Sequence, residues 1–182
     1  MTLEEMKIKV YSLIEEYSED AENLTEDEDL ALKMNSVINQ IQNELARFKK
    51  LDEYTTVDGE QGDIIDFKEL ADDFYQLNIV RGVDVEIIGN KLKFNEDGTA
   101  EIYYYKYPTQ IDNDTDDSQE LDLSIDVLEI MPDGVAAKLL MSDVSSNYGQ
   151  IYAERYERMK NELDPRGAMG SVYIDTSTTI DF

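Results

Sequence analysis

The 182-residue sequence contains no cysteine and no histidine. Disulfide bonds and thiol nucleophiles are therefore excluded, as are zinc sites of the usual ligand types. Acid–base catalysis by imidazole is excluded as well. No glycine-rich phosphate loop, nucleophile elbow or metal-ligand cluster is found in the sequence. We expect a protein that is not an enzyme and that carries no cofactor and no metal.

Basic residues are scarce. Sixteen Lys and Arg stand against 42 Asp and Glu, which gives a formal net charge of −26 at pH 7. Phosphate binding by counterion release needs clustered Lys and Arg, and anionic membrane surfaces repel such a chain. No apolar run approaches about 18 residues, and the first ten residues lack the pattern of a signal peptide. We expect no specific nucleic-acid binding, no membrane association and synthesis in the cytoplasm.

Two amphipathic helices are expected at the start of the chain. Thr2 and Glu5 have the spacing of a capping box. Apolar residues then recur at steps of three and four through residues 3–17 and again through residues 30–51. Because the polar link between them is short, we expect an antiparallel helical hairpin over residues 1–54.

Residues 55–108 have the pattern of a β-rich insertion. Gly89-Asn90 and the stretch from Asn95 to Gly98 mark turns between runs rich in β-branched and aromatic residues. We expect one antiparallel sheet of three to five short strands. In its last strand Tyr103, Tyr105 and Tyr107 share one face and Tyr104 the other. These rings are able to stack on nucleobases or sugars, but few Lys or Arg residues lie nearby to hold a phosphate. Cross-strand pairing within the sheet, or a subunit interface, is therefore the favoured interpretation.

Residues 109–124 form an acidic segment that contains no Lys or Arg. Asp112, Asp114 and Asp116 have the alternate spacing of a calcium-binding loop. Asp117 stands where such a loop needs glycine for its sharp turn, and Leu123 stands where it needs a bidentate glutamate. We therefore expect a solvated loop or a mobile hairpin tip that binds no calcium tightly.

A second pair of helices is expected over residues 125–164. Pro132 suits the first position of a helix, and the apolar residues from Val135 to Leu140 follow it on one face. The next helix carries Arg155, Arg158 and Lys160 beside apolar residues at helical spacing, namely Tyr148, Tyr152, Tyr156, Met159 and Leu163. Pro165 breaks this helix, and apolar and polar residues alternate in the tail that follows. We expect residues 165–182 to form an extended arm that becomes ordered on a partner.

The arrangement VAAKLLMSD…YAERYERMKNEL, over residues 135–163, resembles the C-terminal helices of head–tail connector (adaptor) proteins of tailed double-stranded DNA phages. With the predicted elements, the resemblance implies an α+β chain built as a helical bundle of two antiparallel helix pairs, with an inserted antiparallel β-sheet and an extended C-terminal arm. The inserted sheet departs from compact adaptors, which need far less chain between the helix pairs, so a tail-proximal stopper or a podovirus-type tail component stays open as well. The resemblance also implies a homo-oligomeric ring, typically of twelve subunits, in the virion neck beneath the portal protein. Other neck or tail proteins are further partners, and DNA passes through without specific binding.

The resemblance and the charge together assign roles to three groups of residues. The arm is expected to dock on the portal or on a neighbouring subunit through Tyr173, Ile174, Ile180 and Phe182. The scarce bases of the C-terminal part are expected to form intersubunit salt bridges, namely Arg155, Arg158, Lys160 and Arg166. The acids expected to face the DNA channel or solvent are Asp112, Asp114, Asp116 and Asp117.

Two other functions remain open at this point. An acidic chain without His and Cys is suited to mimic DNA and to block a nucleic-acid-binding enzyme. Such a mimic is expected to be a monomer or dimer that binds a basic enzyme. The charge is also compatible with a bacterial protein of unrelated function, in which it serves solubility alone.

Overall fold

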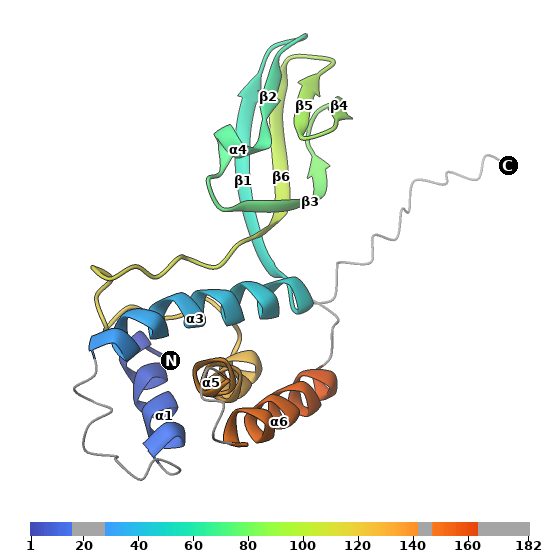
Figure 1. Ribbon diagram of the computed structural model, residues 1–182. Coiled ribbons are helices and arrows are strands. Elements are labelled where there is room, and N and C mark those ends of the chain that lie inside the picture. The colour runs from blue at the N-terminus through green and yellow to red at the C-terminus, as the bar shows by residue number, and fades with distance from the viewer. Residues whose placement is uncertain (16–27, 142–146, 164–182) are drawn as a thin grey trace, which may run out of the picture.

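The computed structural model describes residues 1–15, 28–141 and 147–163 of the chain (Figure 1). This described part is α+β, with five helices and two three-stranded antiparallel sheets. The strands form a β unit on one side of a helical unit, and the chain passes between the two units at residues 49–50 and again after residue 106 (Figure 1). Each unit has its own buried apolar cluster.

The helical unit contains α1 (Leu3–Glu15), α3 (Glu28–Phe48), α5 (Ile125–Leu140) and α6 (Tyr148–Glu162). Helix α5 is central and packs against the other three helices. It is buried almost continuously from Val127 to Ala137, so it needs apolar neighbours on several sides. The predicted apolar stripes on the other helices supply them, with Met6, Val10, Met34, Ile38, Ile41, Leu45, Tyr152 and Tyr156 all buried.

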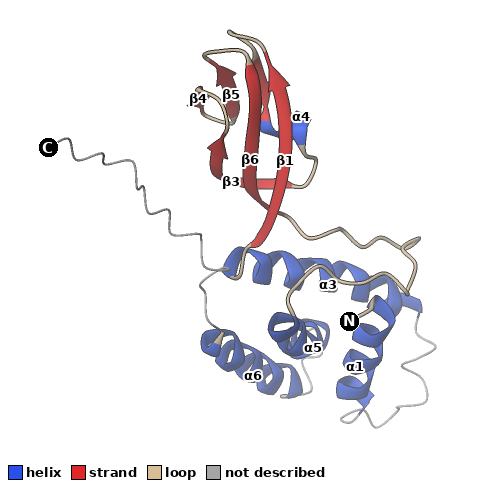
Figure 2. Cartoon of the chain, turned by 180° about the vertical axis from the view of Figure 1, so that it is seen from behind, coloured by secondary structure: helices blue, strands red, loops and turns tan. Residues whose placement is uncertain are grey.

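The predicted hairpin of the first two helices is wrong for the residues that the structure describes. Helix α3 runs across one side of the unit, and α1, α5 and α6 lie beneath it (Figure 2). Helix α1 packs on α5 instead of lying along α3. The apolar surface of α5 explains the difference, because a helix apolar on all sides takes the centre and separates its neighbours.

The predicted beginning of the second helix pair at residue 125 is confirmed, but the suggestion that Pro132 occupies the first position of the helix is wrong. Helix α5 begins at Ile125, and the carbonyl oxygen of Ser124 accepts hydrogen bonds from the N–H groups of Val127 and Leu128 at 3.0 and 2.9 Å. Pro132 lies in the middle of the helix, where it removes one backbone donor. Burial of this helix on three neighbours outweighs the local preference of proline.

The β unit consists of two small sheets. The first has the order β1-β6-β3, formed by β1 (Leu51–Gly59), β6 (Gly98–Lys106) and β3 (Phe74–Arg81). The second has the order β2-β5-β4, formed by β2 (Ile64–Asp66), β5 (Lys91–Phe94) and β4 (Val85–Ile88). A short helix, α4 (Phe67–Leu70), follows β2. The sheets share one cluster made of Phe67, Leu92, Phe94, Ala100, Ile102 and Tyr104.

The predicted architecture, a helical bundle with one inserted sheet, is therefore wrong. The described chain has two three-stranded sheets with a cluster of their own, and its first strand, β1, starts at Leu51 within the predicted helical hairpin. Only Leu51 and Val57 are apolar among the inward residues of β1, so its alternation is hard to recognise in the sequence. A Cβ at Gly59 would lie 2.5 Å from the Phe94 ring, which shows how closely this strand approaches the second sheet.

Candidate functional site

The acidic segment is a loop with exposed carboxylates that is anchored to the helical unit, so of the two predicted alternatives it matches the solvated loop and not the hairpin tip. Ile111, Leu121 and Leu123 are buried in the cluster of the helical unit. The side chain of Asp122 joins the two ends of the segment, because its Oδ2 accepts hydrogen bonds from the backbone N–H and the hydroxyl of Thr109 at 2.8 and 2.7 Å. We call residues 109–124 the acidic ledge.

A row of three amide side chains on α3 binds the beginning of the ledge. Asn35, Asn39 and Gln42 lie at positions i, i+4 and i+7, which places them on one face of the helix. Asn39 pairs with the backbone of Ile111 in both directions: its Nδ2 donates to the carbonyl oxygen at 2.6 Å, and its Oδ1 accepts from the N–H at 2.9 Å. Gln42 Nε2 donates to the carbonyl oxygen of Thr109 at 2.8 Å. These bonds hold the ledge backbone as a strand neighbour would.

The end of the ledge binds the first turn of α1. The N–H groups of Leu3 and Glu4, which have no partner within a helix, donate to the carbonyl oxygens of Gln119 and Asp117, both at 2.9 Å. The predicted capping box at the same turn is confirmed. Thr2 N–H donates to the Glu5 carboxylate at 3.1 Å, and Glu5 N–H donates to the Thr2 hydroxyl at 3.2 Å.

All four predicted channel-facing acids are exposed on the ledge: Asp112, Asp114, Asp116 and Asp117. Their carboxylates do not converge. Asp112 Oδ1 accepts from the N–H of Asp114 at 2.9 Å, and Asp116 Oδ1 accepts from the N–H of Ser118 at 2.8 Å. Hydrogen bonds from Ser118 lower the pKa of Asp116 below its ordinary 3.8. Among the described residues no cluster of three acids has a metal-binding arrangement, and the absence of calcium binding stays a prediction.

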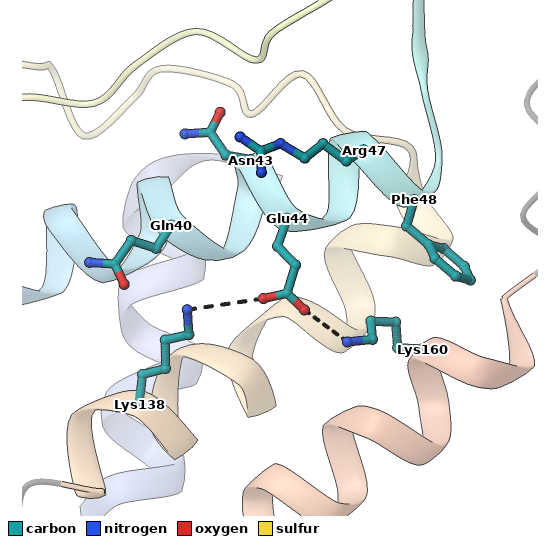
Figure 3. Close-up of a pocket in the computed structure, with 7 residues that line it drawn as sticks. All are labelled: Gln40, Asn43, Glu44, Arg47, Phe48, Lys138 and Lys160. Atoms are coloured by element: carbon teal, nitrogen blue, oxygen red, sulfur yellow. Dashed lines mark hydrogen bonds and ion pairs between the residues drawn. The ribbon is translucent and has the colours of Figure 1, made fainter.

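A hollow of about 670 Å³ lies between α3, α5 and α6 (Figure 3). We call it the basic hollow. Its lining has three bases and one acid, and consists of Gln40, Asn43, Glu44, Arg47, Phe48, Lys138 and Lys160. Glu44 points between Lys160, 2.8 Å away, and Lys138, 4.0 Å away (Figure 3). Arg47 lies with Asn43 on the upper side of the helix, at the rim (Figure 3).

Charged hydrogen bonds set the protonation of this hollow. Burial raises the pKa of Glu44, but hydrogen bonds from Lys160 and Tyr156 and the charges of Lys160 and Lys138 bring it below its ordinary 4.5. Burial lowers the pKa of Lys160, but Glu157 and Glu44 raise it above its ordinary value. Burial, with the neighbouring charge of Glu44, also raises the pKa of the Tyr156 hydroxyl. Glu44 and Lys160 are therefore both charged at neutral pH.

Of the predicted intersubunit bases, two have partners within the chain. Lys160 bridges Glu44 and Glu157, and Arg155 Nε lies 3.1 Å from Asp133 Oδ1. That oxygen lacks a partner of hydrogen-bond geometry among the described groups, so the contact is an ion pair without a hydrogen bond. Arg158 is exposed on α6. Arg166 and the four predicted docking residues, Tyr173, Ile174, Ile180 and Phe182, lie outside the described residues.

The outer face of the first sheet carries tyrosines and cations. The predicted alternation in β6 is confirmed, since Ile102 and Tyr104 are buried and Tyr103 and Tyr105 are half-buried. The ring of Tyr54 lies 5.0 Å from that of Tyr103. Lys50 Nζ lies 4.3 Å from the centre of the Tyr105 ring. Asp52 and Glu101 stand in register with Tyr105 and Thr56 on this face, so it has charges of both signs.

Sequence reasoning missed the amides of α3 and the pair Glu44 and Lys138. The amide row was visible in principle, because Asn35, Asn39 and Gln42 repeat at helical spacing beside an apolar stripe. Glu44 and Lys138 left no comparable pattern, because their partners lie far away in the sequence.

No protein-family model matches the sequence, and the search of curated proteins gave no significant match. No helix within the described ranges has the length and apolar composition needed to cross a membrane.

Proposed function

We propose that this protein is a structural component of a tailed-phage virion, a head–tail connector (adaptor) ring in the neck beneath the portal. The ring lines the DNA channel and bridges head to tail. The observation that carries the proposal is the acidic ledge, in which exposed carboxylates stand on a backbone fixed at both ends. The similarity of residues 135–163 to connector helices supports the same conclusion.

A fixed ledge suits a DNA channel for an electrostatic reason. Phosphates adhere to Lys and Arg but are repelled by carboxylates, so an acidic lining lets the duplex slide. At physiological ionic strength this repulsion reaches roughly 8 Å, so the acids must stand close to the DNA. A mobile acidic loop would fold back or be displaced, whereas the bonds of Asn39 and Asp122 keep this one in place.

The assembly is tested first. Purified protein is mixed with portal-bearing heads, and the complexes are examined by native mass spectrometry and cryo-electron microscopy. We expect a ring of copies beneath the portal. A monomer or dimer that ignores the heads but inhibits a basic nuclease or polymerase would replace the connector with the DNA-mimic alternative.

The predicted arm is tested by truncation after Gly170. A dozen residues cannot order alone against about 1–2 kcal/mol of entropy per residue, but they can when bound to a partner. We expect the truncated chain to keep the circular dichroism spectrum of the helical unit and to lose attachment to heads. Virions that join tails normally with the truncated chain would refute the docking role of the arm.

The role of the ledge is tested by replacing Asp114 and Asp117 with lysine in assembled particles. We expect slower DNA ejection at low ionic strength and recovery at high salt, because added cations attract phosphates and salt screens them. Replacing Asp58 and Asp97, two exposed acids at one end of the β unit, with lysine is the matched control. Equal ejection rates in all three particles would show that the ledge does not face DNA.

A further inference from the structure

The basic hollow departs from the charge balance of the chain. Sixteen bases against 42 acids are found in the whole sequence, yet three bases and one acid line this hollow. The single acid of the lining, Glu44, is held between Lys138 and Lys160, and Lys160 also pairs with Glu157 at 2.6 Å. The excess positive charge therefore lies at Lys138 and Arg47, and Arg47 has no carboxylate within ion-pair distance among the described groups. Phe48 adds an apolar wall. A concave site with excess positive charge fits a convex surface rich in carboxylates.

The acidic ledge is such a surface. In the same molecule it touches the rim of the hollow only through Gln110, which donates to Asn43, and its acid Asp117 lies instead beside α1. The ledge binds α3 through Asn39, and the hollow is centred on Glu44, five residues later. At 3.6 residues per turn these positions are about 140° apart around the helix. The segment after β6 passes α3 on the side facing the β unit, whereas α5 and α6 lie on the other side (Figure 1). One copy is therefore unable to fill its own hollow with its own ledge.

We infer that the basic hollow receives the acidic ledge of a second copy of this chain. The carboxylates of Asp114 and Glu120 then lie against Lys138 and Arg47. This inference rests on the proposed ring and names the contact that builds it. The contact is head-to-tail, with different surfaces on the two partners, and such contacts form closed rings when the rotation between copies closes.

Electrostatics gives this contact its direction. Two chains of −26 repel each other in most orientations, so the few bases decide where copies meet. Like-charge juxtapositions suppress the alternative registers in which ledge meets ledge. The pairing that remains brings the basic hollow of one copy against the acidic ledge of the next, which is the densest exposed run of acids among the described residues.

The test is a charge swap in the full-length protein. Arg47→Glu with Lys138→Glu reverses the hollow at two exposed positions and leaves Lys160 on Glu44. Asp114→Arg with Glu120→Arg reverses the ledge and leaves the turn-forming carboxylates of Asp112 and Asp116 intact. We expect each double variant to remain monomeric by light scattering under conditions in which the parent forms rings. Combining all four changes in one chain restores the opposite charges and the ring.

The control for the hollow variant is Lys68→Glu with Lys91→Glu, which lowers the net charge by the same amount at exposed positions of the β unit. We expect it to assemble like the parent. Circular dichroism melting checks that every variant is folded, and recovery of the ring in the fourfold variant separates a lost contact from a lost fold. Rings that persist in the hollow variant would overturn this inference and leave the proposed ring intact. A parent chain that never forms rings, with or without portal-bearing heads, would instead remove the proposed function.

Discussion

The amide row of α3 gives the sharpest prediction, the replacement of Asn39 with alanine. Asn39 satisfies both backbone groups of Ile111, and Ile111 is only 4% exposed. The substitution leaves a buried donor and a buried acceptor without partners, at about 1–3 kcal/mol each. Water entering the vacated space recovers part of this cost. We expect the free energy of unfolding to fall by about 2–4 kcal/mol, a large share of the ~5–15 kcal/mol typical of a domain.

The assay combines urea unfolding with amide hydrogen exchange. Urea curves give the loss of stability, and exchange shows where it occurs, because the Ile111 N–H loses its acceptor in the variant. The control is Asn43→Ala on the same helix, whose side chain accepts one 3.3 Å hydrogen bond from Gln110. We expect that control to change stability by about 0.5 kcal/mol or less. Equal unfolding midpoints for the two variants, with unchanged exchange at Ile111, would refute the anchoring of the ledge.

Four further results are expected. Replacing Gly134 with alanine places a Cβ 2.8 Å from the Tyr156 ring and should cost about 1–3 kcal/mol in urea unfolding; an unchanged midpoint would mean that α5 and α6 cross less closely. Ile41→Asp places an unpaired charge at a fully buried position and should lower the free energy of unfolding by about 3–5 kcal/mol in the same assay. An unchanged free energy of unfolding would mean that the apolar stripe of α3 is exposed. The depressed pKa of Glu44 stabilises the fold above its ordinary 4.5, and this contribution is lost as the pH falls through the lower folded value. Glu44→Gln should therefore weaken the acid dependence of stability below pH 4.5, and an identical pH profile would contradict the ion-pair assignment. Calorimetry should show no micromolar calcium binding by the acidic ledge, and binding that disappears when its carboxylates are neutralised would reverse that expectation.

Local patterns predicted the elements but not their arrangement. The capping box at Thr2 and the alternation around Tyr104 are confirmed, because capping and strand alternation depend on neighbours in sequence. The helix pair was predicted to begin at residue 125, where α5 does begin, but Pro132 was taken for a first helical position although it lies inside the helix, where burial on three helices outweighs its preference. Strand β1 escaped recognition because Leu51 and Val57 on its inward face are separated by Glu53 and Thr55, and because its partner is a remote strand.

The candidate site was predictable only in its composition. The exposed acids from Asp112 to Asp117 were identified, but the bonds that fix them join Asn39 to a residue 72 positions away. Arg155 and Lys160 were recognised as scarce bases, but their partners, Asp133 and Glu44, lie on other helices. Such pairs depend on the packing of helices and leave no spacing in the sequence.

The place of the β unit within the chain sets the order in which the protein can fold during synthesis. Residues 51–106 contain every described strand and one complete apolar cluster, so this unit has all its partners once they have emerged from the ribosome. Helices α1 and α3 are made earlier but find their central neighbour only when α5, residues 125–140, has been translated. The earliest helices therefore wait for their central neighbour, and their apolar stripes stay available to chaperones for the whole synthesis of the β unit.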